Sequence, residues 1–255
     1  ATDNRLILYG ASNAICLVLF TAFMPFIAIP NFASLICIGI SSLSYTFLVV
    51  FQLSAFQTMN LSVLEPLQKS IKIIVMLAFS TIFLGEHINS VQWIAIVFTI
   101  FGLYMIVDWP LLIKKGHVKN YLACVFAAIL AAITSLTDIV GIRLSGDPLS
   151  YIIWNLLMGV PIVILALSRH ASSVMQFLKI HWKNTCVMCF CDIIQYGLLL
   201  YILYSLNYAQ AMPLLNLTII FSALLGMFVL KEIIPRKNWT AIICLALSVS
   251  LVQLT

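Results

Sequence analysis

The chain is a succession of apolar runs, each long enough to cross a bilayer as a helix and each followed by a short connection. A hydrocarbon core of about 30 Å is crossed by about 20 helical residues. The sequence predicts nine such helices, at 5–29, 33–56, 61–84, 90–108, 120–142, 148–168, 183–206, 208–230 and 238–255. Charged residues make up only 8% of the 255 residues, against about a quarter in soluble proteins. We therefore expect an all-α polytopic integral membrane protein whose surroundings are lipid.

The same composition excludes several classes of protein. Short connections leave no room for a soluble domain, which argues against a secreted disulfide scaffold or a cytosolic enzyme. We expect no cofactor, no metal site and no nucleic-acid partner. The formal net charge of +5 is instead a signal of membrane orientation.

An internal repeat divides the chain into two halves. Glu86 and Trp93 follow one apolar run, and Glu232 and Trp239 follow another at the same spacing. We expect a first repeat at 1–112 and a second at 113–255, corresponding to helices 2–5 and 6–10 of a five-plus-five plan whose first helix is absent from this chain. Repeats with an odd number of helices are inverted relative to each other, and such proteins place a substrate site near the membrane midplane.

Basic residues gather in alternate connections, as the positive-inside rule describes. One side of the predicted membrane holds ten of them, and the opposite side holds Arg143 alone. The basic side should face the cytoplasm, which places the C-terminus outside. The ten residues are Arg5, Lys114, Lys115, Lys119, Arg169, Lys179, Lys183, Lys231, Arg236 and Lys237.

The repeated Leu-x-Glu turns before Trp93 and Trp239, with the stretches 137–154 and 221–226, resemble the drug/metabolite transporter superfamily, EamA type. The resemblance covers essentially the whole chain. It implies an exporter of amino acids or related compounds in a bacterial inner membrane. It also implies that both termini are cytoplasmic, against the charge distribution. The related branch carries an Arg-Glu pair in the ninth helix of the plan where this chain has Leu215 and Asn216.

Ionisable side chains inside apolar segments are candidates for function, because each costs about 2.5–3.5 kcal/mol at mid-helix. Glu65 and Lys69 are spaced i, i+4 and can pair on one helical face. They either neutralise each other near a helix end, or Lys69 faces a central cavity and attracts an anionic group. The resemblance favours the second interpretation for Lys69.

Two aspartates stand in second-half helices. Asp192 shares a helical face with Gln195 and Tyr196, which offers a carboxylate, an amide and a phenol to a cavity. Asp138 has three interpretations: a partner for Arg143, a partner for Lys69 across the repeats, or the carrier of a coupling proton. The last two are open for Asp192 as well. Asn216 and Trp154 complete the predicted substrate-binding set.

The function predicted from these features is secondary transport of a small-molecule metabolite by alternating access, by a monomer or a homodimer. A channel or a non-transporting scaffold is the alternative. A membrane-embedded enzyme is a third interpretation, but the four histidines are scattered singly in connections, with no catalytic string beside them.

Overall fold

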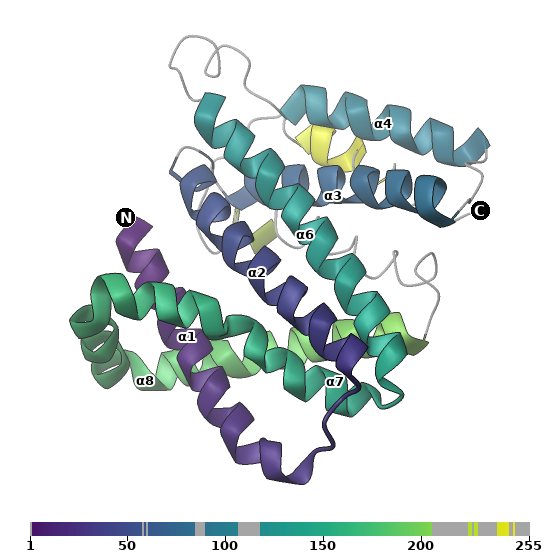
Figure 1. Cartoon of the computed structure of the whole chain (residues 1–255). Helices are drawn as coiled ribbons and strands as arrows, with labels where there is room; N and C mark the ends of the chain where they lie inside the picture. Colours follow the sequence, from purple (N-terminus) through teal and green to yellow (C-terminus); the bar gives the residue numbers. More distant parts are fainter. Residues whose placement is uncertain are drawn as a thin grey trace. The chain divides into compact units, whose positions relative to one another are not determined.

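A computed structural model of the chain describes residues 2–57, 59, 61–84, 90–106 and 118–205, together with 224–225, 227–228, 239–244 and 247. These residues form helices joined by turns, and there is no strand among them (Figure 1). The last two predicted helices, 208–230 and 238–255, fall mostly outside this part of the chain. The all-helical class is confirmed, whereas the number of helices and their inverted repeat remain predictions.

The helices follow the apolar runs of the sequence closely. Four segments are long and apolar enough to span a membrane, at Asn4–Phe26, Phe32–Ala55, Val118–Ser145 and Pro148–Ile202. The elements are α1 (Thr2–Phe23), η1 (Met24–Phe26), α2 (Phe32–Ala55), α3 (Leu61–Leu84), α4 (Ser90–Ile106), α6 (Val118–Ser145), α7 (Pro148–Trp154), η2 (Asn155–Gly159) and α8 (Val160–Ser205).

The chain forms two compact units, each drawn from both halves of the sequence. Unit 1 comprises Ala1–Leu53 and Ile133–Leu206, and unit 2 comprises Ser54–Ala132 and Asn207–Thr255. Helices α2 and α6 each contribute residues to both units. This spatial division differs in kind from the predicted sequence repeats at 1–112 and 113–255, which remain a prediction.

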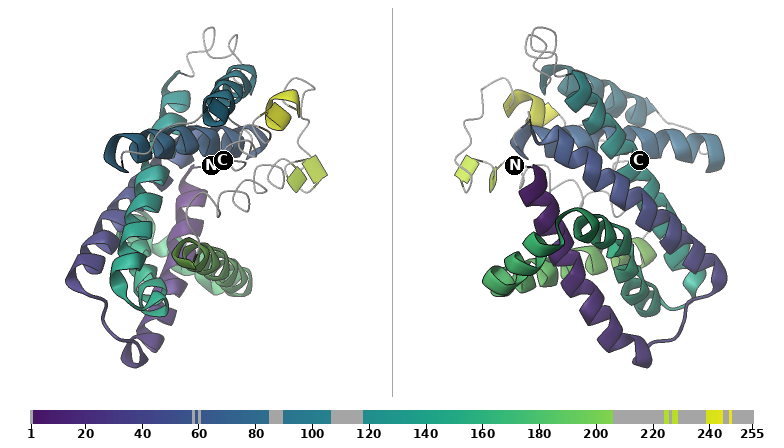
Figure 2. Two further views of the ribbon diagram at one scale, coloured as in Figure 1. Left: turned by 90° about the vertical axis from the view of Figure 1, so that its right-hand side faces the viewer. Right: turned by 60° about the vertical axis from the view of Figure 1, so that its left-hand side comes forward.

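In unit 1, α1 crosses the arms of α8 and contacts it extensively (Figure 2). The approach is close at Gly10, where an added Cβ would overlap the Cβ of Ala166. A buried apolar cluster that includes Leu6, Leu53 and Val174 joins the start of α1, the end of α2 and the bent region of α8. The predicted basic connections 1–5 and 169–183 therefore lie near one end of unit 1.

Hydrogen bonds join the α1–α2 connection and the start of α2 to the end of α6 and the start of α7, at the other end of unit 1. The Ser34 hydroxyl donates to the Gly141 carbonyl at 2.9 Å, and the Ser150 hydroxyl donates to the Ala28 carbonyl at 2.6 Å. A second apolar cluster, with Phe20 and Leu200, packs at this end. The two connections predicted to share one side of the membrane thus lie together.

Two predicted boundaries change along α7, η2 and α8. The predicted helix 148–168 is interrupted, because its residues pass from α7 through the 3₁₀ turn η2 into α8. The predicted connection 169–183 is helical but bent, with non-helical backbone angles at His170 and His181. A straight helix of 46 residues would measure about 69 Å, more than twice the hydrocarbon thickness. The two bends fold α8 back on itself, as Figure 1 shows.

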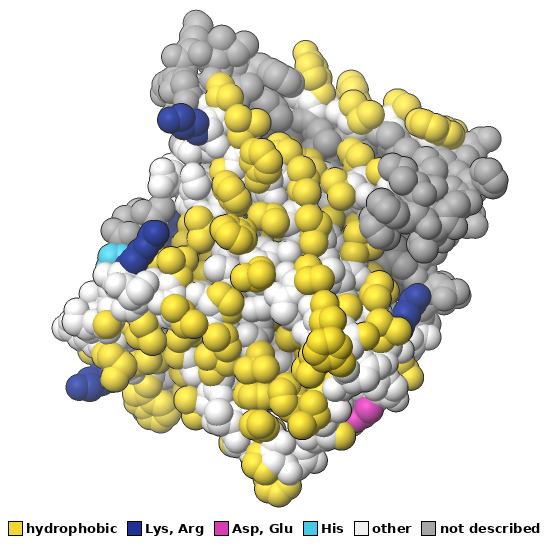
Figure 3. All heavy atoms as spheres, viewed as in Figure 1, with side chains coloured by type: hydrophobic (Ala, Val, Ile, Leu, Met, Phe, Trp, Pro, Cys, Tyr) yellow, Lys and Arg dark blue, Asp and Glu magenta, His cyan; other side chains and the backbone are white. Residues whose placement is uncertain are grey.

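Much of the surface of the described residues is apolar. In unit 2, where α3 packs against α4, one face of α4 exposes Trp93, Val97 and Phe101 by 56%, 63% and 52%. In Figure 3 hydrophobic side chains dominate the visible face, and basic groups appear only as isolated patches. Such large exposed apolar surfaces are rare on soluble monomers and are expected of helices that face lipid.

Candidate functional site

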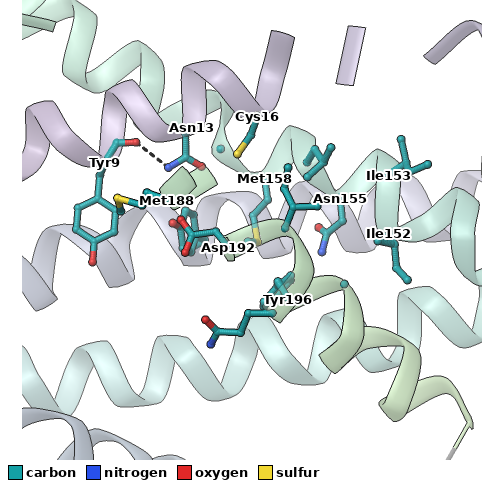
Figure 4. Close-up of a pocket in the computed structure, with 16 residues that line it drawn as sticks. Tyr9, Asn13, Cys16, Ile152, Ile153, Asn155, Met158, Met188, Asp192 and Tyr196 are labelled. Carbon is teal, nitrogen blue, oxygen red and sulfur yellow. Dashed lines mark hydrogen bonds between the residues drawn. The ribbon is translucent and has the colours of Figure 1, made fainter. Parts of the chain in front are cut away.

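A cavity of about 300 Å³ lies within unit 1 (Figure 4). Its walls come from α1, α2, the segment from α7 through η2, and the C-terminal part of α8. The lining residues are Tyr9, Asn13, Cys16, Tyr45, Ile152, Ile153, Asn155, Leu156, Met158, Gly159, Met188, Asp192, Ile193, Gln195, Tyr196 and Gly197.

The 3₁₀ turn η2 forms one wall of this cavity. Helix α7 begins at a cap in which the Asp147 carboxylate accepts the backbone N–H groups of Leu149 and Ser150, at 3.1 and 3.3 Å. In η2 the Met158 carbonyl accepts the Ser42 hydroxyl of α2 at 3.1 Å. Irregular backbone at membrane depth is tolerated where protein groups satisfy it or where it lines a cavity. Both conditions hold for η2.

Asn155, the first residue of η2, has an unsatisfied side chain. It is only 4% exposed, and neither its Nδ2 nor its Oδ1 forms a hydrogen bond of good geometry among the described residues, although the amide lies within reach of the Asp138 carboxylate. Leaving a buried amide unpaired costs about 1–3 kcal/mol. Asn155 lines the cavity, so a shift of this wall would offer its buried amide to a bound molecule as both donor and acceptor.

Helix α1 supplies a second amide, from Asn13. Its Nδ2 donates to the Tyr9 carbonyl at 2.8 Å, the bond dashed in Figure 4. This bond leaves Oδ1 of Asn13 as an acceptor. The position opposite is Gly159, where an added Cβ would overlap Oδ1 of Asn13. A glycine is therefore needed at the end of η2 for α1 to pass so closely.

Helix α8 brings the predicted trio of Asp192, Gln195 and Tyr196 to the cavity. Their spacing of i, i+3 and i+4 places them on one helical face, and all three line the cavity. Asp192 and Gln195 are exposed, whereas Tyr196 is half-buried. The carboxylate is thus accessible to a molecule that enters.

Asp138 lies behind the cavity and does not line it. Its side chain is fully buried and accepts two phenolic hydroxyls, from Tyr151 at 3.0 Å and from Tyr196. The predicted pairing with Arg143 is wrong, because a residue five positions along a helix lies about 140° around its axis and Arg143 is exposed. Tyr196 instead links the buried carboxylate to the cavity wall.

A match to a known protein family indicates the class of protein in which this cavity is found. The model of the EamA-like transporter family matches residues 5–108 and 119–254. The chain belongs to the EamA-like transporter family. The two matches give this EamA-like chain a two-repeat architecture and make it an integral membrane protein of a family of transporters. No curated protein matches the sequence.

The other predicted site residues of the EamA-like chain lie elsewhere. The predicted Glu65–Lys69 pair is confirmed, with Nζ and Oε2 3.5 Å apart in α3 of unit 2. Neither residue lines the unit 1 cavity. Trp154 is buried and packs edge-on against Phe20, with ring centroids 5.3 Å apart. Asn216 lies outside the described residues.

Sequence reasoning passed over two amides of the EamA-like cavity, those of Asn13 and Asn155. Each interrupts a long apolar run. An amide in such a run is costly in lipid, and this signal was as strong as the one that identified Gln195. What the sequence could not show is that η2 breaks its helix beside Asn155.

Proposed function

We propose that this EamA-like chain is a secondary transporter that exports a small polar metabolite, such as an amino acid or a related compound, by alternating access. The metabolite occupies the unit 1 cavity while it crosses a bacterial inner membrane. Export is the direction that the resemblance to EamA-type permeases implies.

The observation that carries this proposal is the unpaired amide of Asn155 in the wall of a cavity that also holds Asp192 and Gln195. Small-molecule sites are mostly apolar hollows with a few polar groups that fix orientation. Transporters often build them where a membrane helix is broken. The segment from α7 through η2 is such a break, and the family match supplies the class of function.

A thermal-shift screen of the purified protein tests the proposal. The panel contains amino acids, amines, carboxylates, phosphorylated metabolites and nucleosides, because a ligand that binds the folded state raises its apparent stability. Asp192→Asn and Lys69→Ala are screened in parallel. We expect a compound whose stabilisation is lost in Asp192→Asn and kept in Lys69→Ala. Loss in Lys69→Ala alone would move the site to α3 and contradict the proposed cavity.

A further inference from the structure

We infer that the unit 1 cavity selects an organic cation: a small amine with an apolar body, held by Asp192. This inference rests on the proposed function and places the substrate among amines related to amino acids, not among the amino acids themselves. It departs from the prediction that Lys69 attracts an anionic group, and it follows from the charges, acceptors and aromatic rings of the cavity wall.

The charge of the cavity wall has one sign. Asp192 is a carboxylate, and no lysine, arginine or histidine is found among the lining residues that the structure describes. Two opposite charges attract each other more strongly beside a protein wall than in bulk water, because the effective dielectric constant is lower there. A ligand carboxylate or phosphate would meet Asp192 without a compensating cation in this wall. A ligand ammonium would find its counter-ion there.

The polar groups around Asp192 present acceptors. Asn13 donates from Nδ2 to the Tyr9 carbonyl and also interacts with the Tyr45 hydroxyl, and no hydrogen bond to its Oδ1 is found among the described residues. The Tyr196 hydroxyl donates to Asp138, so its oxygen can only accept further. Asn155 adds an amide oxygen with no partner among the described residues. An ammonium carries three donors and no acceptor, so it can use these oxygens together with the Asp192 carboxylate, whereas the amide N–H groups of Asn155 and Gln195 remain for other polar groups of the ligand.

The rest of the wall fits an apolar body that carries the charge. Tyr9, Tyr45 and Tyr196 contribute aromatic rings, and the faces of such rings attract cations. Ile152 and Met188 are among the apolar side chains that line the remainder. The volume of about 300 Å³ lies at the lower end of the range for ligand sites. A monoamine with one ring is of a suitable size.

The test compares three compounds that share a phenyl ring and differ in charge. Phenethylammonium is a cation, 2-phenylethanol is neutral and L-phenylalanine is a zwitterion. Dissociation constants are measured by calorimetry on the purified, detergent-solubilised full chain. We expect phenethylammonium to bind about tenfold or more tightly than the other two, the factor that a charged hydrogen bond supplies.

The variants locate that preference. Asp192→Asn should weaken the binding of phenethylammonium about tenfold and remove the preference for the cation. Asp192→Glu should retain part of that preference. Asp147→Asn is the matched control, because it removes an exposed carboxylate of unit 1 outside the cavity and asparagine caps helices as well as aspartate. Melting and gel filtration establish that each variant is folded.

Each other result overturns the inference. Equal binding of 2-phenylethanol or L-phenylalanine by the wild type would show that the cavity does not select charge. An unchanged preference in Asp192→Asn would remove that residue's role. If none of the three compounds binds, the cavity does not select an organic cation of this kind. The proposed transport function would then be tested by the wider thermal-shift panel.

Discussion

At the scale of single residues, the cavity keeps a polar group that the fold does not need. Asn155 is buried and unpaired in the described structure, so it weakens the ligand-free state. Residues selected for binding are often of this kind, since a site optimised for a ligand is left unsatisfied without it. Stability and binding should therefore respond in opposite directions when Asn155 becomes apolar.

We expect Asn155→Leu to raise the free energy of unfolding by about 1–3 kcal/mol, because it removes an unpaired buried amide and keeps a similar volume. The melting temperature in detergent measures this. The same variant should lose the stabilisation that cavity ligands give the wild type. A lower melting temperature would show that the amide has a structural partner.

Asp138 gives a second prediction at this scale. Tyr151→Phe removes one of the two hydroxyls that the buried carboxylate accepts, so it should destabilise the fold by about 1–3 kcal/mol. Tyr201→Phe is the control, since Tyr201 is 52% exposed. Equal melting temperatures for the two variants would mean that the hydroxyl of Tyr151 contributes nothing to Asp138.

At the scale of elements, close helix contacts depend on particular glycines. An added Cβ at Gly141 of α6 would overlap the Tyr151 ring, whereas Gly39 of α2 has nothing within 4 Å. We expect Gly141→Ala to destabilise by about 1–3 kcal/mol through overpacking. Gly39→Ala should stabilise by about 0.5–1 kcal/mol through helix propensity. Chemical denaturation measures the free energy of unfolding of both variants. A change of the same sign in the two variants would contradict the close contact between α6 and α7 at Gly141.

Most of the helices, but not the break at η2, could be predicted from the sequence. The apolar runs predicted α2, α3, α4 and α6 to within a few residues, because length and hydropathy decide which segments cross a bilayer. The trio on α8 followed from helical periodicity. The break at η2 was not predicted, although Asn155, Gly159 and Pro161 lie in this run. Its extent depends on a tertiary contact, since the backbone of η2 is held by Ser42 from a distant helix.

The partner of Asp138 was missed for a similar reason. Sequence spacing suggested Arg143, but the carboxylate is satisfied by Tyr151 and Tyr196 from two other helices. Tertiary contacts of this kind carry no periodic signal. The cavity likewise joins residues from both ends of unit 1's sequence, Tyr9 to Gly197.

At the scale of the whole molecule, charge predicts orientation. Arg5 and the basic residues of 169–183 should face the cytoplasm, and the C-terminus should lie outside. Alkaline phosphatase fused after Thr255 should be active in intact cells, whereas a fluorescent protein inserted after Ser172 should fold in the cytoplasm. An inactive phosphatase at Thr255 would favour the cytoplasmic termini that the family resemblance implies.

The most direct test of the central claim is counterflow in proteoliposomes, using the radiolabelled panel compound that most raises the melting temperature. The account predicts uptake by the wild type and by Gly39→Ala, and loss of uptake by the folded Asn155→Leu variant. Binding without uptake by the wild type would indicate a scaffold. Undiminished uptake by Asn155→Leu would contradict the claim that the substrate passes through the unit 1 cavity.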